Sequence, residues 1–489
     1  MLLRNASGPV PGTQDLHEPG LAALQHTRGQ IQEFLWSYGY RTLEVPVLED
    51  TDLYLRKLGS QVAASLFTFV DQRGSRLCLR PEFTGSVIRH YIQHAQELPL
   101  PVRWQYCGPV FRDQETPSQQ LRQFTQLGAE LIGPASSRAD AELLALACKG
   151  LQRLNLPQTR VVIGHAGLLP SLLNGFQLPE RVKMYVASHV ELLREGSDGM
   201  AKLRQGLEEL RTLPIGGTPV TRALSRPAEA EEVTSLVRWF LDEGTTRPLG
   251  RRTPEEILQR FQTKLHGAEN PEHLEHAVAL AKDLAPVRAA PEQALADGQR
   301  IIEKYGLDQR PLRKLEQVIE LLSAQELGNV TLEVDLGLTR ALGYYTGIVF
   351  ELFLDAAGQP PVGGGGRYDG LVRALGGAQD VPTLGFAYTL ESLVAHLPEP
   401  QKKNDATPTS GVLVVPEQDS DFPAATRHAE AVRNSGRWAT VEVMGWTATE
   451  REHYCRAAGI ERLALVGTGG VRETLLNAEV APYAPTGTP

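Results

Sequence analysis

Two apolar stretches joined by a polar loop place the strongest constraint on this sequence. The stretches cover residues 106–112 and 122–130, and their composition predicts two β-strands. Side chains alternate between the two faces of a strand, so Gln126 and Glu130 share one face of the second strand. Arg112 ends the first strand, so a cation, an amide and a carboxylate come to lie on one sheet surface. A small zwitterion, such as an amino acid, needs about that set of partners.

The length and composition of the chain predict a soluble protein with more than one domain. Its 489 residues exceed what one ordinary core holds, so we expect two or more domains. Contents of 42% hydrophobic and 22% charged residues are typical of soluble globular proteins. No run of about 18 apolar residues is present, so we expect no membrane span. Residues 1–9 lack the apolar segment of a secretory signal.

Charge and cysteine content argue against several classes of protein. The net charge of −9 disfavours a protein that mainly grips nucleic acid, because clustered lysine and arginine supply that grip. The four cysteines are far apart and form no CxxC pair, which disfavours a zinc site or a disulfide framework and indicates a reducing cytoplasm. The twelve histidines show no paired metal-ligand spacing, so we expect no metal site. No nucleophile motif is present either.

The first part of the chain, residues 1–185, is predicted to form one mixed α/β unit. Apolar spacing over residues 21–38 predicts a helix that ends at Gly39. Short apolar runs separated by turns then predict antiparallel strands. These strands cover residues 43–48, 66–70, 77–79, 102–106 and 127–132. A helix over residues 139–154 and a strand over residues 159–163 complete this part.

The rest of the chain changes character twice. Residues 186–327 are helix-rich and charged, which predicts a helical insertion. Strand patterns then resume, so we expect one core made of residues 1–185 and 328–398. A polar linker with several prolines leads to residues 410–489, where strands and helices alternate as in a small α/β domain with a parallel component.

Several short segments carry side chains that can bind ligands, and each also has a plainer interpretation. Glu82 and Thr84 follow a strand that ends at a proline, where a carboxylate can accept hydrogen bonds from an ammonium group. Taken alone, a surface turn is the favoured interpretation of this segment. Glu130 is explained equally well as a ligand contact or as half of an internal ion pair. The adjacent Tyr344 and Tyr345 are more typical of sheet packing.

A run of four glycines, residues 363–366, precedes a predicted helix over residues 368–375. Glycines let a backbone approach a ligand closely. The remaining residues of a phosphate-binding loop are missing, so this is not a phosphate cradle. A flexible turn is the favoured interpretation of the glycine run.

Taken together and in this order, these segments resemble histidyl-tRNA synthetases and their paralogue, the regulatory subunit of ATP phosphoribosyltransferase. The resemblance covers about residues 8–195 and 328–398, and it is weaker beyond them. Residues 38–46 resemble motif 1 of the class II synthetases, and the spacing over residues 111–124 is that of motif 2. The other matching segments are residues 11–15, residues 340–345, which are similar to the histidine-specific signature RGLDYY, and residues 365–371.

The resemblance implies a fold of the α+β class. This is a class II aminoacyl-tRNA synthetase-like antiparallel sheet with flanking helices, plus a helical insertion and a small C-terminal α/β domain. It also implies a binding site for histidine. The residues that would form this site are Glu82, Thr84, Arg112, Gln126, Glu130, Arg340, Tyr344 and Tyr345.

The resemblance also implies a role for each part of the site. Glu82, Thr84 and Gln126 would hold the α-amino group of the ligand. Glu130 and Tyr345 would recognise its imidazole. A buried carboxylate and a phenol can select an imidazole because its two nitrogens offer N–H donors when charged. The two arginines of the site, at positions 112 and 340, would neutralise the substrate carboxylate and the α-phosphate.

The positions that would handle ATP depart from the family pattern. Motif 2 of the family has Arg-x-Glu, whereas residues 112–114 are Arg-Asp-Gln. Residues 119–120 are Gln-Gln in place of Gly-Arg, and Ser392 stands where motif 3 has an arginine. The family arginine stacks on adenine and meets phosphate, which serine does not. Losing two cations and one acid removes transition-state stabilisation on the order of several kcal/mol.

We therefore predict a cytoplasmic synthetase paralogue that has no catalytic residues and no cofactor. It would bind histidine, form a homodimer through motif 1, and associate with the catalytic subunit of a short-form ATP phosphoribosyltransferase. In that complex it would activate the first step of histidine biosynthesis and relay feedback inhibition. The alternatives are an active histidine–tRNA ligase with unusual ATP contacts and an enzyme that forms another acyl-adenylate. Residues 401–489 carry nine Lys or Arg against eleven Asp or Glu, a net charge of −2, so a role in gripping nucleic acid is not expected.

Overall fold

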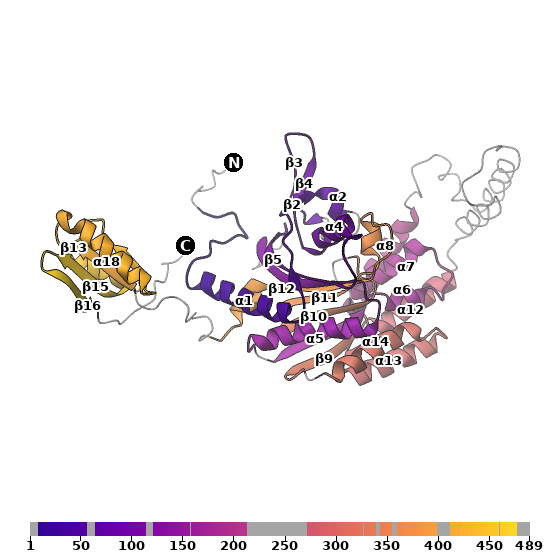
Figure 1. The fold of residues 1–489 in the computed structure, drawn as a ribbon. Coiled ribbons are helices and arrows are strands. Elements are labelled where there is room, and N and C mark those ends of the chain that lie inside the picture. The colour runs from indigo at the N-terminus through magenta and orange to yellow at the C-terminus, as the bar shows by residue number, and fades with distance from the viewer. Residues whose placement is uncertain are drawn as a thin grey trace. The chain divides into compact units, whose positions relative to one another are not determined.

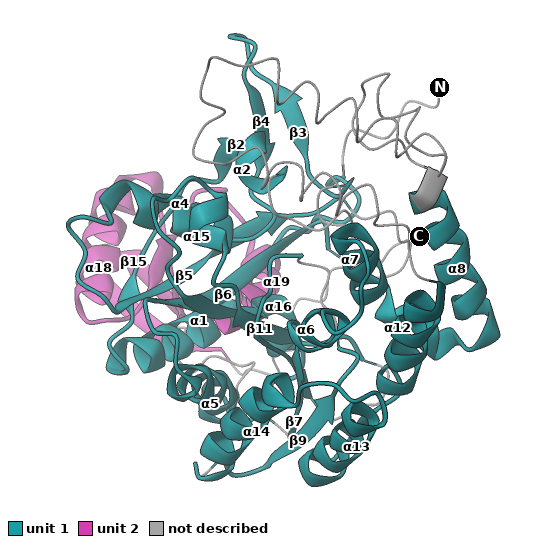
Figure 2. Ribbon diagram, turned by 90° about the vertical axis from the view of Figure 1, so that its right-hand side faces the viewer, with its two compact units in different colours: residues 1–16, 24–398 teal, residues 17–23, 399–489 magenta. Residues whose placement is uncertain are grey.

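The computed structural model describes most of the chain and divides it into two compact units. The described residues are 8–55, 64–113, 121–156, 158–212, 271–325, 327–338, 343–354, 359–398, 411–458 and 460–476. One unit comprises residues 1–16 and 24–398, and the other comprises residues 17–23 and 399–489 (Figure 2). Each unit is built around a sheet of its own.

The larger unit contains a long sheet. Its described strands are β1 (Arg41–Thr42), β5 (Val102–Phe111), β6 (Gln123–Ile132), β7 (Thr159–His165), β8 (Arg288–Ala289), β9 (Val330–Asp335), β10 (Ile348–Leu354), β11 (Gly363–Arg367) and β12 (Thr383–Thr389). They are arranged in the order β1-β5-β6-β12-β11-β10-β7-β9-β8. The pairs β1–β5 and β7–β9 run parallel, whereas the central pairs run antiparallel. The predicted antiparallel sheet is therefore confirmed, with parallel strands toward its two edges.

Helices cover one face of this sheet and pack against it through apolar side chains. The helices α5 (Ser137–Arg153) and α14 (Arg310–Ser323) lie along that face, and α1 (Gly20–Ser37) also packs into its core (Figure 1). Strand β6 sends Leu127, Ala129 and Leu131 to it, and all three are fully buried. These odd-numbered positions alternate with the Gln126 and Glu130 positions, so the two faces of β6 differ in chemistry.

Shorter elements cover the opposite face of the sheet. The helices α4 (Thr84–His94) and α15 (Leu371–Ala374) lie there (Figure 2). Val87 of α4 and Leu371 of α15 belong to a core that includes Trp104 and Tyr106 of β5. Beside α4 lie the helix α2 (Thr51–Leu55) and a small sheet in the order β2 (Leu48–Asp50), β4 (Arg76–Leu79), β3 (Thr68–Val70).

Helices form most of the described chain between β7 and β9. They are α6 (Leu168–Leu173), α7 (Glu180–Ser188), the 3-10 helix η1 (Val190–Glu195), α8 (Ser197–Thr212), α12 (Pro271–Leu284), α13 (Pro291–Lys304) and α14. Leu203 of α8, Leu280 of α12 and Leu315 of α14 join the apolar core beneath the long sheet. The helix-rich composition is therefore borne out in the described residues, and the boundaries of a separate insertion stay a prediction.

Three predicted elements are wrong or shorter than expected. Residues 363–366 form most of β11, not a flexible turn, and the helix predicted over residues 368–375 is only the short α15. A Cβ at Gly365 would lie 2.6 Å from the Cα of Phe386 on β12, so the close strand pairing requires glycine there. Of the strand predicted over residues 43–48, only Leu48 belongs to a strand, β2, because Pro46 between β1 and β2 lacks the N–H group that a ladder requires.

The smaller unit contains a four-stranded sheet in the order β14 (Ala439–Val441), β13 (Gly411–Pro416), β15 (Ile460–Gly467), β16 (Gly470–Leu475). Strand β13 runs parallel to both of its neighbours, as expected for an α/β arrangement. Helix α18 (Phe422–Asn434) packs through Ala429 on one face and α19 (Ala448–Ala457) through Cys455 on the other. A short 3-10 helix, η2 (Asp419–Asp421), precedes α18.

The last helix of the larger unit, α16 (Leu390–Ala395), follows β12 directly. None of the helices described in either unit has the length and apolar character that crossing a membrane requires.

Candidate functional site

The predicted site residues gather over β5 and β6, on the face that α4 covers. Seven of the eight lie in the described part of the chain, and Arg340 falls outside it. The residues come from the turn before α4 and its first residue, from the end of β5, from β6, and from the segment before β10. The cation, amide and carboxylate that the sequence predicts on one sheet surface, Arg112, Gln126 and Glu130, are all among the described residues.

Glu82 lies immediately before α4, where its carboxylate accepts hydrogen bonds from two backbone N–H groups. The donors are the N–H of Thr84 and, at 2.8 Å, the N–H of Gly85. The first N–H groups of a helix have no partner within the helix, so a carboxylate there is held firmly. Glu82 is 3% exposed and Thr84 is also buried, so the surface turn favoured from sequence is wrong. Burial raises the pKa of Glu82, against the lowering effect of these hydrogen bonds and of Arg112.

Glu130 is the most enclosed acid of the site, with 1% of its surface exposed. Its Oε1 accepts hydrogen bonds from Thr84 Oγ1 at 2.7 Å and from Tyr106 Oη at 3.2 Å, and its Oε2 accepts one from Tyr368 Oη. Its described partners are thus three hydroxyl groups, which argues against the internal ion pair considered from sequence. Burial raises the pKa of Glu130 well above its usual value.

Thr84 connects the two acids. Its backbone N–H donates to the carboxylate of Glu82 and its hydroxyl donates to the carboxylate of Glu130. One residue at the start of α4 therefore orients both carboxylates, so any movement of this turn alters the whole site.

The two adjacent tyrosines lie against the same acids. Tyr344 is buried, and burial together with the nearby charges of Glu82 and Glu130 raises the pKa of its phenol well above the usual value. The ring of Tyr345 lies 4.9 Å from that of Tyr344 and 6.0 Å from that of Tyr368, between ring centroids. Both predicted tyrosines therefore reach the site, while the phenols that bond Glu130 are those of Tyr106 and Tyr368.

The sheet beneath the cluster is lined with glycine. Residues directly opposite each other in an antiparallel pair point to the same face, and Glu130 faces Gly385 of β12, which faces Gly366 of β11. A Cβ at Gly385 would collide with the Glu130 carboxylate, and one at Gly366 would lie 2.9 Å from the Tyr345 ring. On β6 itself, a Cβ at Gly128 would lie 2.7 Å from Tyr106 Oη. The bare backbone is what lets the phenols and the carboxylate lie close to the strands.

Arg112 and Gln126 mark the far end of the cluster. Arg112 donates from Nε to the carbonyl of Pro81 at 3.0 Å, and its guanidinium lies 5.3 Å from the centre of the Phe124 ring. Gln126 is half-buried and pairs with Gly108 across β5 and β6, on the same face as Glu130. The charge of Arg112 reaches Glu82, because it lowers the pKa of that acid.

Described residues beside the positions that depart from the family pattern are engaged within the protein. Arg122 pairs with Asp113, and its guanidinium lies 4.7 Å from the ring centre of Phe67. Glu391, at the start of α16, accepts from the backbone N–H of Thr125 at 2.8 Å and 2.9 Å. The next residue is Ser392. The glutamines at positions 114, 119 and 120 fall outside the described residues.

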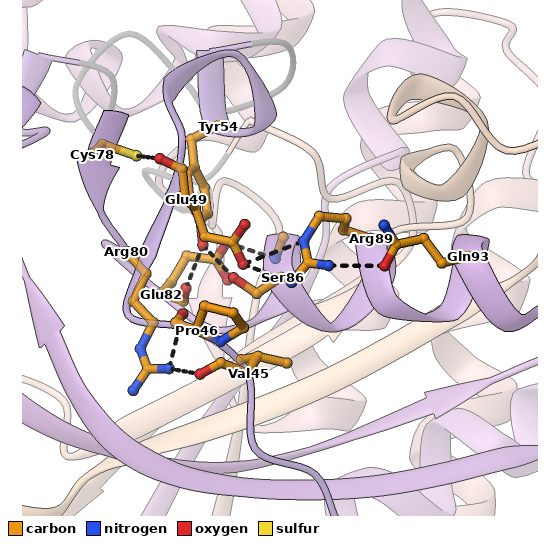
Figure 3. A network of polar contacts seen from close by, with 11 residues as sticks. Val45, Pro46, Glu49, Tyr54, Cys78, Arg80, Glu82, Ser86, Arg89 and Gln93 are labelled. Atoms are coloured by element: carbon orange, nitrogen blue, oxygen red, sulfur yellow. Dashed lines mark hydrogen bonds and ion pairs between the residues drawn. The ribbon is translucent and has the colours of Figure 1, made fainter. Parts of the chain in front are cut away.

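A second polar network supports the backbone of the turn before α4 (Figure 3). Tyr54 of α2 donates to the carbonyl of Glu82 at 3.1 Å and lies 2.8 Å from Ser86 Oγ. Arg80 donates to the carbonyls of Val45 at 2.6 Å and Pro109 at 2.9 Å. These contacts fix the backbone that presents Glu82.

The charges of the site define the ligand that would suit it. The cluster contains two buried carboxylates, Glu82 and Glu130, and Arg112 lowers the pKa of the first, so a ligand with a positive group would pair well with these acids. An ammonium or imidazolium group would complete this balance, and a carboxylate on the same ligand would suit Arg112. No group of His, Cys, Asp and Glu side chains among the described residues has the arrangement of a metal site.

The architecture is that of a class II aminoacyl-tRNA synthetase-like protein, and solved structures share it. One is the ATP phosphoribosyltransferase regulatory subunit/histidyl-tRNA synthetase from Bacillus halodurans C, with a TM-score of 0.62 and 20% identity over 94% of this chain and 98% of that one. Another is apo histidyl-tRNA synthetase from S. aureus, with a TM-score of 0.59 and 23% identity over 97% of this chain and 98% of that one.

The family model of histidyl-tRNA synthetase matches residues 12–243 and 245–393, so this chain belongs to the histidyl-tRNA synthetase family. Curated relatives include the histidine–tRNA ligases of Methanococcus vannielii, which is 24% identical, and Pyrococcus abyssi, which is 27% identical. Each alignment covers 94% of this chain, with 92% and 90% of the respective relatives.

The sequence prediction missed two residues of the cluster, Tyr106 and Tyr368. Tyr106 lies on β5 opposite Gly128, so the alternation that placed Glu130 also places Tyr106 on the same face. Tyr368 follows β11 inside the conspicuous segment at residues 365–371, and only the pairing of β11 with β12 brings it to Glu130. The first was accessible from the strand pattern, and the second needed the sheet order.

Proposed function

We propose that this protein is a regulatory, histidine-binding subunit that activates a short-form ATP phosphoribosyltransferase, without aminoacylation activity of its own. The observation that carries the proposal is the contrast between the two halves of the site. The acids Glu82 and Glu130 are buried, oriented by Thr84, and lie near Arg112. Ser392 stands where the family resemblance calls for an arginine.

The acid half suits free histidine on chemical grounds. Glu82 would receive the α-ammonium group beside the N–H groups of the α4 turn, and Glu130 would receive the imidazole. Arg112, with Arg340, would receive the carboxylate. Gln126, Tyr344 and Tyr345 would complete the enclosure. An amino acid with an apolar side chain would bring no N–H donor to the carboxylate of Glu130, which would then keep only its three hydroxyl partners and gain nothing from the ligand.

The nucleotide half lacks the cations that adenylation requires. Charge on ATP grows during attack by a carboxylate, and prearranged cations stabilise that transition state. Ser392 supplies no charge, and Arg122 is already paired with Asp113. The name of the related Bacillus halodurans C structure, which combines a regulatory subunit with a synthetase, supports a regulatory role in this family. Such regulation requires histidine to favour one conformation of the complex over another.

The runner-up is an active histidine–tRNA ligase, which the names of the curated relatives favour. Two measurements on the full chain decide between them. Calorimetry should detect histidine binding, and histidine-dependent exchange of pyrophosphate into ATP should be absent. Stimulation of a short-form ATP phosphoribosyltransferase, reversed by histidine, would complete the case. Robust exchange would reject the proposal in favour of the ligase, and binding of another amino acid in preference to histidine would reject both.

A further inference from the structure

The turn that presents Glu82 is supported by a residue from a different element. Tyr54 belongs to α2, whereas Glu82 lies 28 residues later, immediately before α4. Tyr54 is 1% exposed, and its phenol donates a hydrogen bond to the backbone carbonyl of Glu82 at 3.1 Å. A buried carbonyl without a donor costs free energy, so this bond favours one position of the Glu82 backbone over others.

The hydroxyl of Ser86 completes the support. Ser86 is fully buried, and its Oγ lies 2.8 Å from Tyr54 Oη (Figure 3). Because the phenol hydrogen is used on the carbonyl of Glu82, the hydroxyl of Ser86 is the donor in this second bond. The chain of bonds runs from Ser86 in the first turn of α4, through Tyr54, back to Glu82. The turn from residue 82 to residue 86 is thus closed by one outside phenol.

The ring of Tyr54 also fixes the turn by contact. A Cβ at Gly85 would lie 2.7 Å from Cε1 of Tyr54, so the ring lies directly against the backbone of Gly85. The N–H of Gly85 is one of the two donors to the Glu82 carboxylate. The same side chain therefore supports the Glu82 carbonyl and one of the groups that orient the Glu82 carboxylate.

An ion pair joins α4 to the strand that precedes α2. Glu49 of β2, just before α2, lies 2.9 Å from Arg89 of α4, and Glu49 is buried. Burial raises the pKa of the Tyr54 phenol well above its usual value, so it remains a donor at any physiological pH. Neither Tyr54 nor Ser86 bonds to the Glu82 carboxylate itself, so both act through the backbone.

We propose that Tyr54 is a positioning residue that sets the site's preference for ligands with an α-ammonium group. This inference rests on the proposed function, because it takes Glu82 as the group that receives the ammonium. By fixing the backbone of residues 82–86, Tyr54 keeps the Glu82 carboxylate aimed at the ligand nitrogen. Loss of the phenol hydroxyl lets the carboxylate drift, so affinity falls for ligands that carry the ammonium group and is kept for those that lack it.

The test compares histidine with imidazolepropionate, which keeps the imidazole and the carboxylate but lacks the amino group. Calorimetry on the full chain measures both ligands with wild type, Tyr54→Phe, Ser86→Ala and Glu82→Gln. Glu82→Gln should remove most of the preference for histidine. Tyr54→Phe should weaken histidine about tenfold, a change of about 1.4 kcal/mol, and leave imidazolepropionate within about twofold. Ser86→Ala should give a smaller loss in the same direction.

Tyr388→Phe is the matched control. Tyr388 is equally buried on β12, and its phenol also donates to a backbone carbonyl, that of Ala147 on the opposite side of the sheet. Both phenylalanine variants should lower the melting temperature, and only Tyr54→Phe should change the ratio of the two affinities. Ser86→Ala serves as the decisive variant if Tyr54→Phe does not fold.

The outcomes separate the two claims. If wild type prefers histidine and Glu82→Gln abolishes that preference, while Tyr54→Phe and Ser86→Ala leave the ratio unchanged, the positioning role of Tyr54 is overturned and the proposed function stands. An equal loss for both ligands in Tyr54→Phe also overturns it, because that result indicates general destabilisation. Absence of histidine binding by wild type overturns the proposed function, and this inference with it.

Discussion

In the proposed function, Glu130 is the carboxylate that would select the ligand. Three hydroxyls, from Thr84, Tyr106 and Tyr368, surround it in a buried setting. Each hydroxyl is both a donor and an acceptor, so the group can adapt when a ligand N–H replaces one of them. A site of this kind discriminates strongly against ligands that leave its buried polar groups without partners.

The substitution Glu130→Ala should weaken histidine binding by about 1–3 kcal/mol, since it leaves buried hydroxyls and the ligand donor without an acceptor. Calorimetric titration measures the loss directly. Arg103→Ala is a suitable control, because Arg103 pairs with the partly exposed Glu142 away from the cluster. An affinity for histidine that does not change in Glu130→Ala would mean that this acid only supports the fold.

His165 should make the stability of the protein depend on pH. Burial, with the nearby charges of Lys314 and Arg367, lowers the pKa of His165 to about 4. In the unfolded chain a histidine takes up its proton near pH 6.5, whereas His165 in the folded protein stays neutral until about pH 4. The unfolded state therefore binds more protons in this range, and the free energy of unfolding falls as the pH is lowered from about 6.5 to about 4.

The contribution of His165 to this loss is at most about 3 kcal/mol, from about 1.4 kcal/mol for each pKa unit. The substitution His165→Gln should flatten the corresponding part of the profile. Urea unfolding of both proteins at pH 7, 6, 5 and 4.5 measures it. Parallel profiles for wild type and variant would show that His165 is protonated in the folded protein as readily as in the unfolded chain.

At the scale of elements, the strands β6, β11 and β12 contribute backbone more than side chains. Gly128, Gly366 and Gly385 lie on the face that carries Glu130. The space that a Cβ would fill at each glycine is taken by a neighbouring side chain. These side chains are those of Tyr106, Tyr345 and Glu130, respectively. Strand pairing therefore places the chemistry of the site: Gln126 and Glu130 come from β6 itself, and other site residues come from neighbouring segments.

The substitution Gly385→Ala should abolish histidine binding while the protein still folds. Its methyl group would collide with the carboxylate of Glu130 and lie 2.6 Å from Tyr368 Oη, so the acid has to turn away from its three donors. The expected loss of affinity is more than tenfold, or at least about 1.4 kcal/mol. Gly370→Ala, where a Cβ would meet nothing within 4 Å, should leave binding unchanged. Wild-type affinity in Gly385→Ala would show that the acid is not required in its present position.

The same strands show what could be predicted from the sequence. Alternation correctly placed Gln126 and Glu130 on one face of β6, because the period of two is a property of the strand alone. The glycine strand β11 was predicted as a turn. The local sequence does not distinguish glycines that close strand packing requires from glycines that make a turn flexible. Its identity depends on the partners β10 and β12, which are contacts between distant segments.

The candidate site was predictable to the same extent. The acids and the tyrosine pair stood out through family motifs, whereas the favoured local interpretation of Glu82 and Thr84, a surface turn, was wrong. Burial of that turn results from α2 and the long sheet closing over it, as the contact of Tyr54 with Gly85 shows. This burial depends on tertiary contacts, so neither the spacing nor the composition of residues 79–84 predicts it.

For the whole molecule, the central question is whether the chain retains any adenylation activity. The substitution Ser392→Arg alone should not restore exchange of pyrophosphate into ATP, because Gln114 and Gln120 would still stand where the family has an acid and a cation. The expected signal is indistinguishable from that of Ser392→Ala, the control for disturbance of α16. Exchange that appears with Ser392→Arg would mean that one cation is enough, and that the chain is closer to an active ligase than proposed.

The glycine-lined sheet under the cluster has a consequence for attempts at redesign. The glycine backbone offers the same atoms to every amino acid, so it does not determine which ligand the site selects. A library intended to recruit a different metabolite should therefore randomise the hydroxyl- and carboxyl-bearing positions and spare Gly128, Gly366 and Gly385. Side chains at the three glycines would displace Tyr106, Tyr345 and Glu130, so variation there would disrupt the site without creating new recognition.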